Sequence, residues 1–227
     1  CALMRIKANG QTEDCARGQV DGLGHTARFT MRFNDGHDNI NLSMPSGTNT
    51  AHKDALGLIL KTVDDIYGLK SLVGAGHRIV HGGKTYRESL ILNENILNDL
   101  SALNSLAPLH QPHNLDGVRA FMTAFPQLPQ IGCFDTAFHA TLPEEEYAFA
   151  LPQNLRRDGV RRYGFHGLSY QYIMGQLKTL SAKAGERVIM AHLGNGASLC
   201  ATLKSLSLAT TMGFSALDGL IMGTRSG

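Results

Sequence analysis

The stretch "ERVIMAHLGNGASLCATL", residues 186–203, places two apolar runs on either side of a Gly-Asn-Gly loop. Runs of this length and composition are typical of buried strands, so the stretch predicts a strand-loop-strand hairpin. Two explanations account for the glycines. A tight hairpin turn needs residues that accept unusual backbone angles, whereas a bound phosphate group needs close approach of the backbone. For the loop taken alone, the hairpin turn is the simpler explanation.

Segments of strand and helix character alternate upstream of this hairpin, which favours the α/β class with a mixed β-sheet and flanking helices. The first 50 residues contain short strand-like runs among Gly, Asp, Asn, His and Thr, and they predict a small meander. Two further strand-like runs, 71–83 and 129–139, lead into loops. Apolar residues at helical spacing predict helices over residues 50–67, 93–106, 114–126 and 169–185, the first behind a Thr or Asn cap.

The composition is that of an ordinary globular protein. With 227 residues, 43% of them hydrophobic, the chain is long enough for one large or two small domains with a sizeable core. Its 21 Lys and Arg against 19 Asp and Glu leave a net charge of +2, too small to indicate a nucleic-acid or anionic-membrane partner. The apolar runs are far shorter than the roughly 20 residues of a membrane span. We therefore expect no nucleic-acid partner and no membrane anchor.

The four cysteines, Cys1, Cys15, Cys133 and Cys200, are scattered and form no C-x-x-C pair. Neither a zinc site nor a disulfide scaffold is indicated, and a reducing cytoplasm is the expected location. The sequence starts on Cys rather than Met and stops within the glycine-containing run "GTRSG". These two features predict a chain that is cut at both ends.

Polar side chains follow several of the predicted strands. Ligands of open α/β sheets bind outside the carboxyl ends of the strands, so these residues are the first candidates for a site. Asp135 comes directly after the apolar run "QIGCF", where an unpaired carboxylate is costly to bury, and we expect it to face a cation or a cleft. The other candidates are Arg78, His81, Thr136, His139, Arg162, His166, His192, Gly194, Asn195, Gly196 and Arg225.

Many of these candidates also have a purely structural explanation. Buried arginines such as Arg78 or Arg225 often pair with a structural carboxylate. Histidines near strand ends are more often hydrogen-bonded parts of the scaffold than ligands. The histidines to which this applies are His81, His110, His139 and His192.

Standard nucleotide and metal signatures, namely G-x-x-x-x-G-K-[ST], G-x-G-x-x-G after a strand and H-E-x-x-H, are absent from the sequence. His77 and His81 have the spacing of a helical metal pair but lie in a strand-like run, so no metal site is predicted. The basic and aromatic run "RRDGVRRYGF" is weak evidence for nucleic-acid binding by a nearly neutral chain. Several arginines and histidines around one carboxylate and a glycine loop instead suit an anionic substrate and phosphoryl transfer.

Six segments, in order between Gly76 and Gly227, resemble signatures of the acetate kinase (acetokinase) family. They are "GHRIVHGG", "LAPLHQPHN", "FDTAFHATLPEEEYAFALP", "RRYGFHGLSYQYI", "HLGNGAS" and "TTMGFSALDGLIMGTRSG". The family lies within the superfamily of sugar kinases, actin and heat-shock chaperone ATPases. The resemblance therefore implies an actin-like, ribonuclease H-like kinase domain.

The same resemblance implies an activity and its site. The implied enzyme phosphorylates acetate with ATP and Mg²⁺ by direct in-line transfer, which gives acetyl phosphate and ADP, and it is a cytoplasmic homodimer. Asp135 resembles the family's essential carboxylate, which positions or deprotonates the acetate, while His166 and Arg225 resemble the residues that stabilise the transition state. The resemblance assigns substrate binding to Arg78, Val80 and His110, and phosphate binding to His192, Leu193, Gly194, Asn195 and Gly196.

Val80 follows Arg78 by two residues, so the two side chains share one face of a strand. The resemblance implies that this position walls the acyl pocket, where valine leaves room for acetate more readily than for propionate. One methylene group discriminates by only about 1 to 3 kcal/mol. A propionate kinase or another short-chain acyl kinase is therefore an alternative.

The sequence departs from the family pattern at both ends. The family opens with a strand and an Asn-x-Gly-Ser-Ser-Ser-x-Lys phosphate loop, of which "IKANGQTED" is at most a faint echo, and it continues well beyond "TRSG". The resemblance divides the chain into an N-terminal acyl-substrate domain, residues 1–140, and the start of a nucleotide-binding domain, residues 141–227. The missing segments also leave open a catalytically incomplete binding or dimerisation module.

Overall fold

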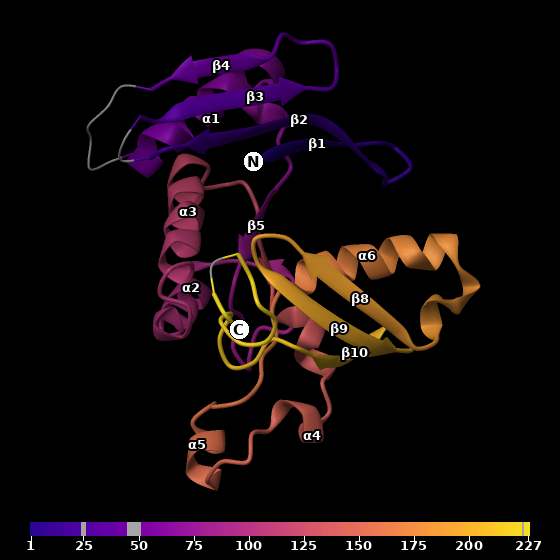
Figure 1. Cartoon of the computed structure of the whole chain (residues 1–227). Helices are drawn as coiled ribbons and strands as arrows, with labels where there is room; N and C mark the ends of the chain where they lie inside the picture. The colour runs from indigo at the N-terminus through magenta and orange to yellow at the C-terminus, as the bar shows by residue number, and fades with distance from the viewer. Residues whose placement is uncertain (24–25, 45–50, 224) are drawn as a thin grey trace. The chain divides into compact units, whose positions relative to one another are not determined.

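The computed structural model describes residues 1–23, 26–44, 51–223 and 225–227. They form two compact units, Cys1–Leu72 and Val73–Gly227, which Figure 1 colours from indigo to yellow along the chain. Each unit has hydrophobic clusters of its own and is described by itself. No helix within these described ranges is long and apolar enough to cross a bilayer.

The first unit is an antiparallel sheet of β1 (Ala2–Ile6), β2 (Thr12–Asp21), β3 (Arg28–Phe33) and β4 (Ile40–Ser43), in that order. Helix α1 (Ala51–Tyr67) and the 3₁₀ helix η1 (Leu69–Ser71) follow. Alternation along β3 buries Phe29 and Met31, which pack with Val63 of α1. The predicted meander and the first predicted helix are confirmed, and the cap predicted ahead of that helix lies outside the described residues.

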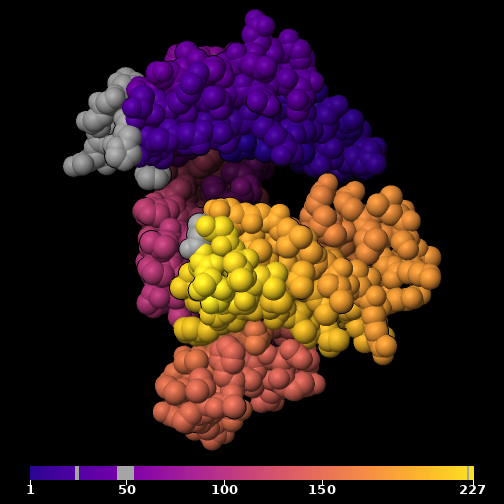
Figure 2. Space-filling view, viewed as in Figure 1, coloured from indigo at the N-terminus to yellow at the C-terminus, as the bar shows by residue number. Residues whose placement is uncertain are grey.

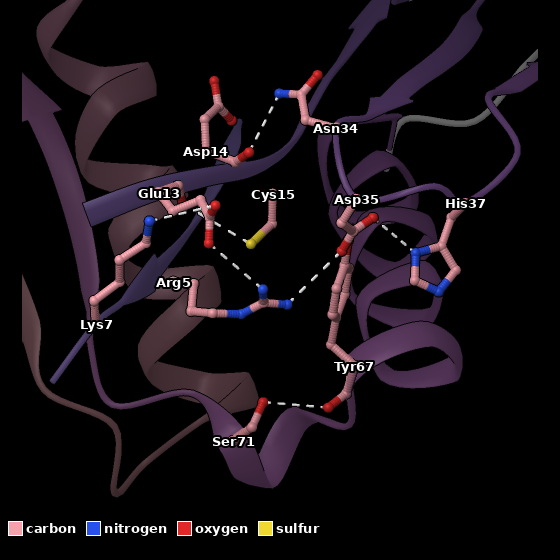
Figure 3. A network of polar contacts seen from close by, with 10 residues as sticks. All are labelled: Arg5, Lys7, Glu13, Asp14, Cys15, Asn34, Asp35, His37, Tyr67 and Ser71. Carbon is pink, nitrogen blue, oxygen red and sulfur yellow. Dashed lines mark hydrogen bonds and ion pairs between the residues drawn. The ribbon is translucent and has the colours of Figure 1, made fainter. Parts of the chain in front are cut away.

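Figure 3 shows a polar network that joins the end of α1 to the strands of the first unit. The Tyr67 hydroxyl donates to one carboxylate oxygen of Asp35 at 2.7 Å, and Nδ1 of His37 lies 2.8 Å from the other. Arg5 lies 3.6 Å from Glu13 and 3.9 Å from Asp35. The hydrogen bonds from His37 and Tyr67 lower the pKa of Asp35, so this carboxylate holds its charge at the centre of the network.

The second unit begins with a mixed sheet of β5 (Ala75–Ile79), β6 (Leu90–Ile91) and β7 (Gln130–Phe134). The central strand β7 is parallel to β5 and antiparallel to β6. Because β5 and β7 are parallel, their carboxyl ends lie at the same edge of the sheet. Helices α2 (Glu94–Ser101) and α3 (Gln111–Ala124) supply apolar side chains to the core of this sheet, which includes Ile79, Leu97, Leu100, Leu115, Val118 and Phe134.

An antiparallel sheet forms the other half of the second unit. Its strands, in spatial order, are β10 (Leu206–Thr210), β9 (Ala197–Leu203) and β8 (Val188–Leu193). Helix α6 (Gly167–Leu180) lies along this sheet (Figure 1) and buries Tyr170 and Met174 against Met190 and Cys200. The 3₁₀ helix η3 (Ala137–Thr141), which follows β7, packs on both α6 and β10 and so joins the two sheets.

The short helices α4 (Glu144–Tyr147) and α5 (Gln153–Arg157) lie on a segment that projects from the rest of the second unit (Figures 1 and 2). The Arg161 guanidinium lies 3.7 Å from the centre of the Tyr147 ring at the base of this segment. The candidate Arg162 donates to the carbonyl oxygens of Glu146, Thr210 and Met212 at 3.1 to 3.3 Å. Arg162 therefore holds the segment in place and does not face an anion site.

The predicted α/β class, a mixed sheet with flanking helices, is confirmed, with differences at the helix ends. The helix predicted over 93–106 ends at Ser101, and the 3₁₀ helix η2 (Asn104–Leu106) follows. The helix predicted over 169–185 ends at Leu180, before the 3₁₀ helix η4 (Ala182–Gly185). Helix α3 begins earlier than predicted, at Gln111, because a proline fits the first turn of a helix.

The compact units do not follow the proposed division of the chain at residue 140. The boundary between them falls between Leu72 and Val73, and the 3₁₀ helix η3 itself runs across residue 140 and packs on α6 and β10. The division into residues 1–140 and 141–227 concerns which ligand each part binds, and it stays a prediction.

Candidate active site

Asp135 and Arg78 meet at the shared carboxyl edge of β5 and β7. Arg78 Nε donates to both carboxylate oxygens of Asp135 at 3.1 Å, and its Nη2 donates to Oδ2 at 2.6 Å. The carboxylate is only 2% exposed, whereas the arginine side chain is 65% exposed. The hydrogen bonds to Asp135 raise the pKa of Arg78. The expectation that Asp135 faces a cation is confirmed, and the pair presents a fixed positive charge to the outside.

The start of α6 is attached directly to the backbone of Asp135. Gly167 N–H donates to the Asp135 carbonyl oxygen at 2.8 Å, and a Cβ at Gly167 would lie 2.2 Å from that oxygen. The preceding residue, His166, has a φ of 60° in the left-handed region. This conformation costs a residue other than glycine about 1 to 2 kcal/mol and is concentrated at functional sites. His166 thus stands at the start of α6, one residue before the attachment to Asp135, and the charges of Asp135 and Arg78 both act on its imidazole.

The imidazole of His166 is held by a hydrogen bond and by ring stacking. Nδ1 of His166 lies 2.8 Å from Ser198 Oγ, and the His192 ring stacks on it with centroids 4.0 Å apart. Burial lowers the pKa of His166 to about 4, with His192 and the two arginines, Arg78 and Arg225, acting in the same direction and Asp135 against it. His166 is therefore neutral near pH 7.

The Gly-Asn-Gly loop joins β8 to β9 as a tight hairpin. Leu193 pairs with Ala197, and Gly194 N–H donates to the Gly196 carbonyl oxygen at 3.1 Å. A Cβ at Gly196 would lie 3.0 Å from His166 Nε2 and 3.9 Å from Arg225 Nη2. The hairpin explanation of the glycines is therefore confirmed, and the loop backbone also closely approaches the imidazole and guanidinium groups. That the loop binds a phosphate stays a prediction.

The C-terminal segment lies on this loop and carries Arg225 to it. Gly223 N–H donates to the Asn195 carbonyl oxygen at 3.3 Å, and a Cβ at Gly223 would lie 2.7 Å from Asn195 Oδ1. Met222 N–H donates to the Arg225 carbonyl oxygen at 2.9 Å, which closes a short turn. Figure 2 shows the yellow C-terminal segment against the orange surface of the second unit. Segments far apart in the sequence thus converge around Gly196.

Val80 and His110 lie in different surroundings. Val80 is 5% exposed and packs in a cluster with Phe165 and Ala197, the neighbours of His166 and Gly196. It is therefore an apolar wall beside the convergent polar groups. His110 is an exposed residue that immediately precedes α3. The contacts of the described residues do not join its side chain to the other site residues, so its role in binding stays a prediction.

Two other candidate histidines belong to the scaffold. His139 is 1% exposed, and its ring nitrogens contact Ser207 Oγ at 2.8 Å and the Phe165 carbonyl oxygen at 2.9 Å. His81 is fully buried, and its Nδ1 accepts from Gly83 N–H at 2.9 Å. Burial lowers the pKa of both histidines to about 4. Both nitrogens of the neutral His139 ring have hydrogen-bond partners, whereas Nε2 of His81 is buried without one among the described residues and that ring mainly packs against Tyr163 and Phe165.

We expect acid to destabilise the second unit between pH 6.5 and pH 4. In the folded chain the pKa of His81, His139 and His166 is lowered by burial to about 4, whereas an unfolded histidine titrates near pH 6.5. Between these values the unfolded chain binds more protons, so this contribution is complete above pH 6.5 and is lost toward pH 4. Urea unfolding at pH 7, 6 and 5 checks this, and a constant midpoint would contradict it.

Three residues that support the histidines, Ser169, Tyr170 and Ser198, are not among the candidates that the sequence indicates. Ser169 Oγ lies 2.9 Å from Nδ1 of His192, and Ser198 Oγ contacts both His166 and the Tyr170 hydroxyl. Ser169 and Tyr170 follow His166 by three and four residues. Side chains at this spacing lie on the same face of a helix, so the sequence does contain a signal for these two residues. Ser198 lies opposite His192 in the hairpin. This pairing can be predicted only when the length of the connecting loop is known.

Chemically, the site gathers hydrogen-bond donors and cations around one place and contains one paired carboxylate. The space beside Gly196 that a Cβ would fill is bordered by an imidazole nitrogen and a guanidinium group, which suits an anion with several oxygens. The described residues contain no cluster of three or more His, Cys, Asp or Glu that is arranged to hold a metal ion.

The chain matches the model of the acetokinase family over residues 3–227. Acetate kinase of Rhodopseudomonas palustris (strain ATCC BAA-98 / CGA009) is 47% identical over 212 residues, which cover 92% of this chain and 53% of the relative. Acetate kinase of Clostridium beijerinckii is 40% identical over 223 residues, covering 95% and 55%. The chain spans about half the length of the curated relatives that it matches.

Solved structures agree with this match. A propionate kinase from Francisella tularensis superposes with a TM-score of 0.90 at 34% identity, covering 100% of this chain and 57% of that one. Porphyromonas gingivalis acetate kinase gives 0.82 at 36% identity, covering 95% and 55%. The implied actin-like kinase fold is confirmed by these likenesses. The chain belongs to the acetokinase family.

Proposed function

We propose that this chain forms the acyl-substrate site and part of the phosphate site of an acetate kinase, which transfers the terminal phosphoryl group of ATP to acetate. The products are acetyl phosphate and ADP. The observation that carries the proposal is the convergence at Gly196 of the His166 imidazole and the Arg225 guanidinium. The paired Arg78 and Asp135 both act on the charge of that imidazole. The names of the curated relatives support the choice of acid.

In this mechanism Arg78 binds the carboxylate of the acyl substrate. Its side chain is largely exposed, while the buried carboxylate of Asp135 fixes its orientation through three hydrogen-bond contacts. Acetate is already ionised near pH 7, as carboxylic acids with pKa values of about 4 are. We therefore assign Asp135 a positioning role, and the attacking carboxylate oxygen needs no base.

The transferred phosphoryl group lies between the loop and the two side chains that border Gly196. Negative charge in this transition state is spread over the phosphoryl oxygens, and fixed donors aimed at them lower the barrier. The neutral His166 contributes an N–H donor, Arg225 contributes a full positive charge, and the amides around Gly194 and Gly196 contribute fixed dipoles. Removing one such donor typically lowers the rate about 10²–10³-fold.

ATP and Mg²⁺ fit this site to different degrees. The donors around Gly196 suit the phosphates of ATP, and His192, Leu193 and Asn195 complete the loop that we assign to them. Mg²⁺ is usually held by the phosphates together with one or two carboxylates. The described residues hold no metal cluster, so Mg²⁺ enters here as a companion of ATP, and no step is assigned to it. A cytoplasmic homodimer is part of the same proposal.

Propionate is the second candidate substrate, because a solved propionate kinase superposes with a TM-score of 0.90. The buried Val80 is the residue we expect to separate the two acids, since a longer acyl chain would press on its side chain. One methylene group changes kcat/KM by about 10- to 200-fold at most. Measuring kcat/KM for acetate and propionate at saturating ATP decides between them, and a higher value for propionate would replace the acetate assignment.

Formation of the acyl phosphate tests the proposal itself. The protein that contains residues 1–227 is incubated with ATP, Mg²⁺ and acetate, and the acyl phosphate is trapped with hydroxylamine. We expect an ATP-dependent hydroxamate from acetate. A folded protein that binds acetate and ATP but forms no acyl phosphate would favour the alternative, a binding or dimerisation module.

Replacing Gly196 by alanine is expected to lower kcat/KM for ATP by about 10-fold or more. The new Cβ would lie 3.0 Å from His166 Nε2 and would occupy the place assigned to a phosphate oxygen, so close backbone approach would be lost. Gly175→Ala is the control, because Gly175 lies on α6 outside the loop and a Cβ there meets nothing within 4 Å. Equal kinetics for the two variants would remove the phosphate from this position.

A further inference from the structure

A short chain of hydroxyl groups runs from the core of the second unit to His166. The Tyr170 hydroxyl contacts Ser198 Oγ, and Ser198 Oγ lies 2.8 Å from Nδ1 of His166. Tyr170 is 1% exposed and Ser198 is fully buried. Tyr170 lies on α6 and Ser198 on β9, so the packing of helix against sheet sets the length of this chain.

The direction of hydrogen-bond donation along these hydroxyl groups follows from the buried end, Tyr170. The contacts of the described residues give the Tyr170 hydroxyl one side-chain partner, Ser198. Burial raises the pKa of Tyr170, so the phenol keeps its proton near pH 7 and this proton needs an acceptor. Ser198 Oγ is thus the acceptor available to the phenol proton, and a buried hydroxyl that donates to nothing is costly.

The position of the proton on His166 follows from this direction. If Tyr170 donates to Ser198 Oγ, the serine proton is free to donate to Nδ1 of His166, which must then be unprotonated. A neutral imidazole holds its one proton on the other nitrogen. The opposite direction would start from Nδ1–H and end at the Tyr170 oxygen, where the phenol proton would have no acceptor.

We propose that Tyr170 and Ser198 are positioning residues that keep His166 in the tautomer with its proton on Nε2. The Nε2 atom is the one that borders Gly196, at 3.0 Å from the place of a Cβ. The hydroxyl chain thereby turns a neutral histidine into a hydrogen-bond donor aimed at the glycine loop. Its consequence for phosphoryl transfer rests on the function proposed above, whereas the tautomer itself does not.

Other contacts agree with this assignment. The ring of His192 stacks on His166 and leaves the ring edges free for hydrogen bonds. Nδ1 of His192 is engaged by Ser169, so each stacked ring has its own serine at Nδ1. The left-handed backbone of His166 and the attachment of Gly167 to Asp135 hold the ring from its other side. Each contact limits rotation of the ring and so favours a single tautomer.

The tautomer is measured directly on the protein that contains residues 1–227. Protein labelled with ¹⁵N-histidine is examined by long-range ¹H–¹⁵N correlation, which distinguishes a protonated ring nitrogen from an unprotonated one. His166→Gln identifies the signals of His166 among the 10 histidines. We expect Nε2 to be protonated and Nδ1 unprotonated at pH 7. A protonated Nδ1, or a mixture of both forms, would overturn the proposal whether or not the protein is an active kinase.

Tyr170→Phe tests the residue at the buried end. Without the phenol proton, Ser198 Oγ is able to accept from Nδ1–H, so we expect a mixture of tautomers. We also expect kcat to fall about 10-fold while KM for ATP and acetate changes less than about 2-fold, because a transition-state donor is lost and binding is not. Tyr172→Phe is the control, since Tyr172 lies on the same helix and is 65% exposed.

Failure of the proposed function and failure of the positioning role give different experimental results. If the tautomer shifts in Tyr170→Phe but no variant or parent protein forms acyl phosphate, the proposed function fails and the positioning role stands. If the tautomer of His166 is the same in the parent, in Tyr170→Phe and in Ser198→Ala, the positioning role fails. If loss of the phenol hydroxyl in Tyr170→Phe disturbs folding, the Ser198→Ala variant tests the positioning role in its place.

Discussion

Asp135→Asn is expected to lower kcat/KM for acetate by about 10²–10³-fold, the range typical of losing one charged or preorganised contact at a reacting centre. The amide keeps the shape of the side chain but has no charge, and its NH₂ group turns a donor toward the donors of Arg78. The three contacts that orient the guanidinium are then weakened together. Steady-state kinetics at saturating ATP measures the loss.

The fold is expected to tolerate this change. The Arg78 side chain is 65% exposed, so removal of its partner leaves a hydrated cation and not a buried one. The free energy of unfolding should therefore change far less than the activity. Asp116→Asn is the control, since Asp116 is 70% exposed and pairs with Arg119 at 3.7 Å. Near-normal activity of Asp135→Asn would reduce Asp135 to part of the scaffold.

Gly167→Ala is expected to lower the free energy of unfolding by about 1 to 3 kcal/mol, the usual cost of overpacking a filled position. The added Cβ would lie 2.2 Å from the Asp135 carbonyl oxygen and 2.9 Å from Phe138 Cβ. A backbone oxygen cannot move aside as a flexible side chain can, so α6 must shift away from β7. That shift moves His166, and we expect activity to fall as well.

The same helix provides a control variant in which the free energy of unfolding is expected to rise instead of fall. Gly175 also lies in α6, but a Cβ there meets nothing within 4 Å. Gly175→Ala should stabilise the chain by about 0.5 to 1 kcal/mol, because glycine is a poor residue for the interior of a helix. Urea unfolding of the two variants tests the contrast. A loss of stability in both, or in neither, would contradict the attachment of α6 to the end of β7.

The sequence predicted the parts of the site that local pattern determines. Asp135 follows a buried strand, and its need for a cation follows from the cost of burying charge. The Gly-Asn-Gly hairpin follows from two flanking strands. Which cation pairs with Asp135 depends on the parallel register of β5 and β7, in which Arg78 lies opposite Cys133, and one sequence does not contain that register.

Other parts of the site depend on packing between distant segments. Ser198 reaches both Tyr170 and His166 because α6 lies against β9, a contact that no local period reveals. The left-handed φ of His166 cannot be predicted from the sequence either. Gly167, the next residue, is typical of a helix start, and its close contact with the Asp135 carbonyl is known only from the structure. The strand β10 was not predicted, because its sequence LSLAT breaks the alternation of apolar and polar residues at Ala209, where the pairing register with β9 also shifts.

The most direct test of the account is the conversion of acetate to its acyl phosphate by the protein that contains residues 1–227, measured beside its Asp135→Asn and Gly196→Ala variants. We predict ATP-dependent acetyl phosphate from the parent protein and a large loss in both variants, with Gly175→Ala and Asp116→Asn retaining activity. Equal acyl phosphate formation by the parent and the two site variants would contradict the account, because the reaction would then take place elsewhere.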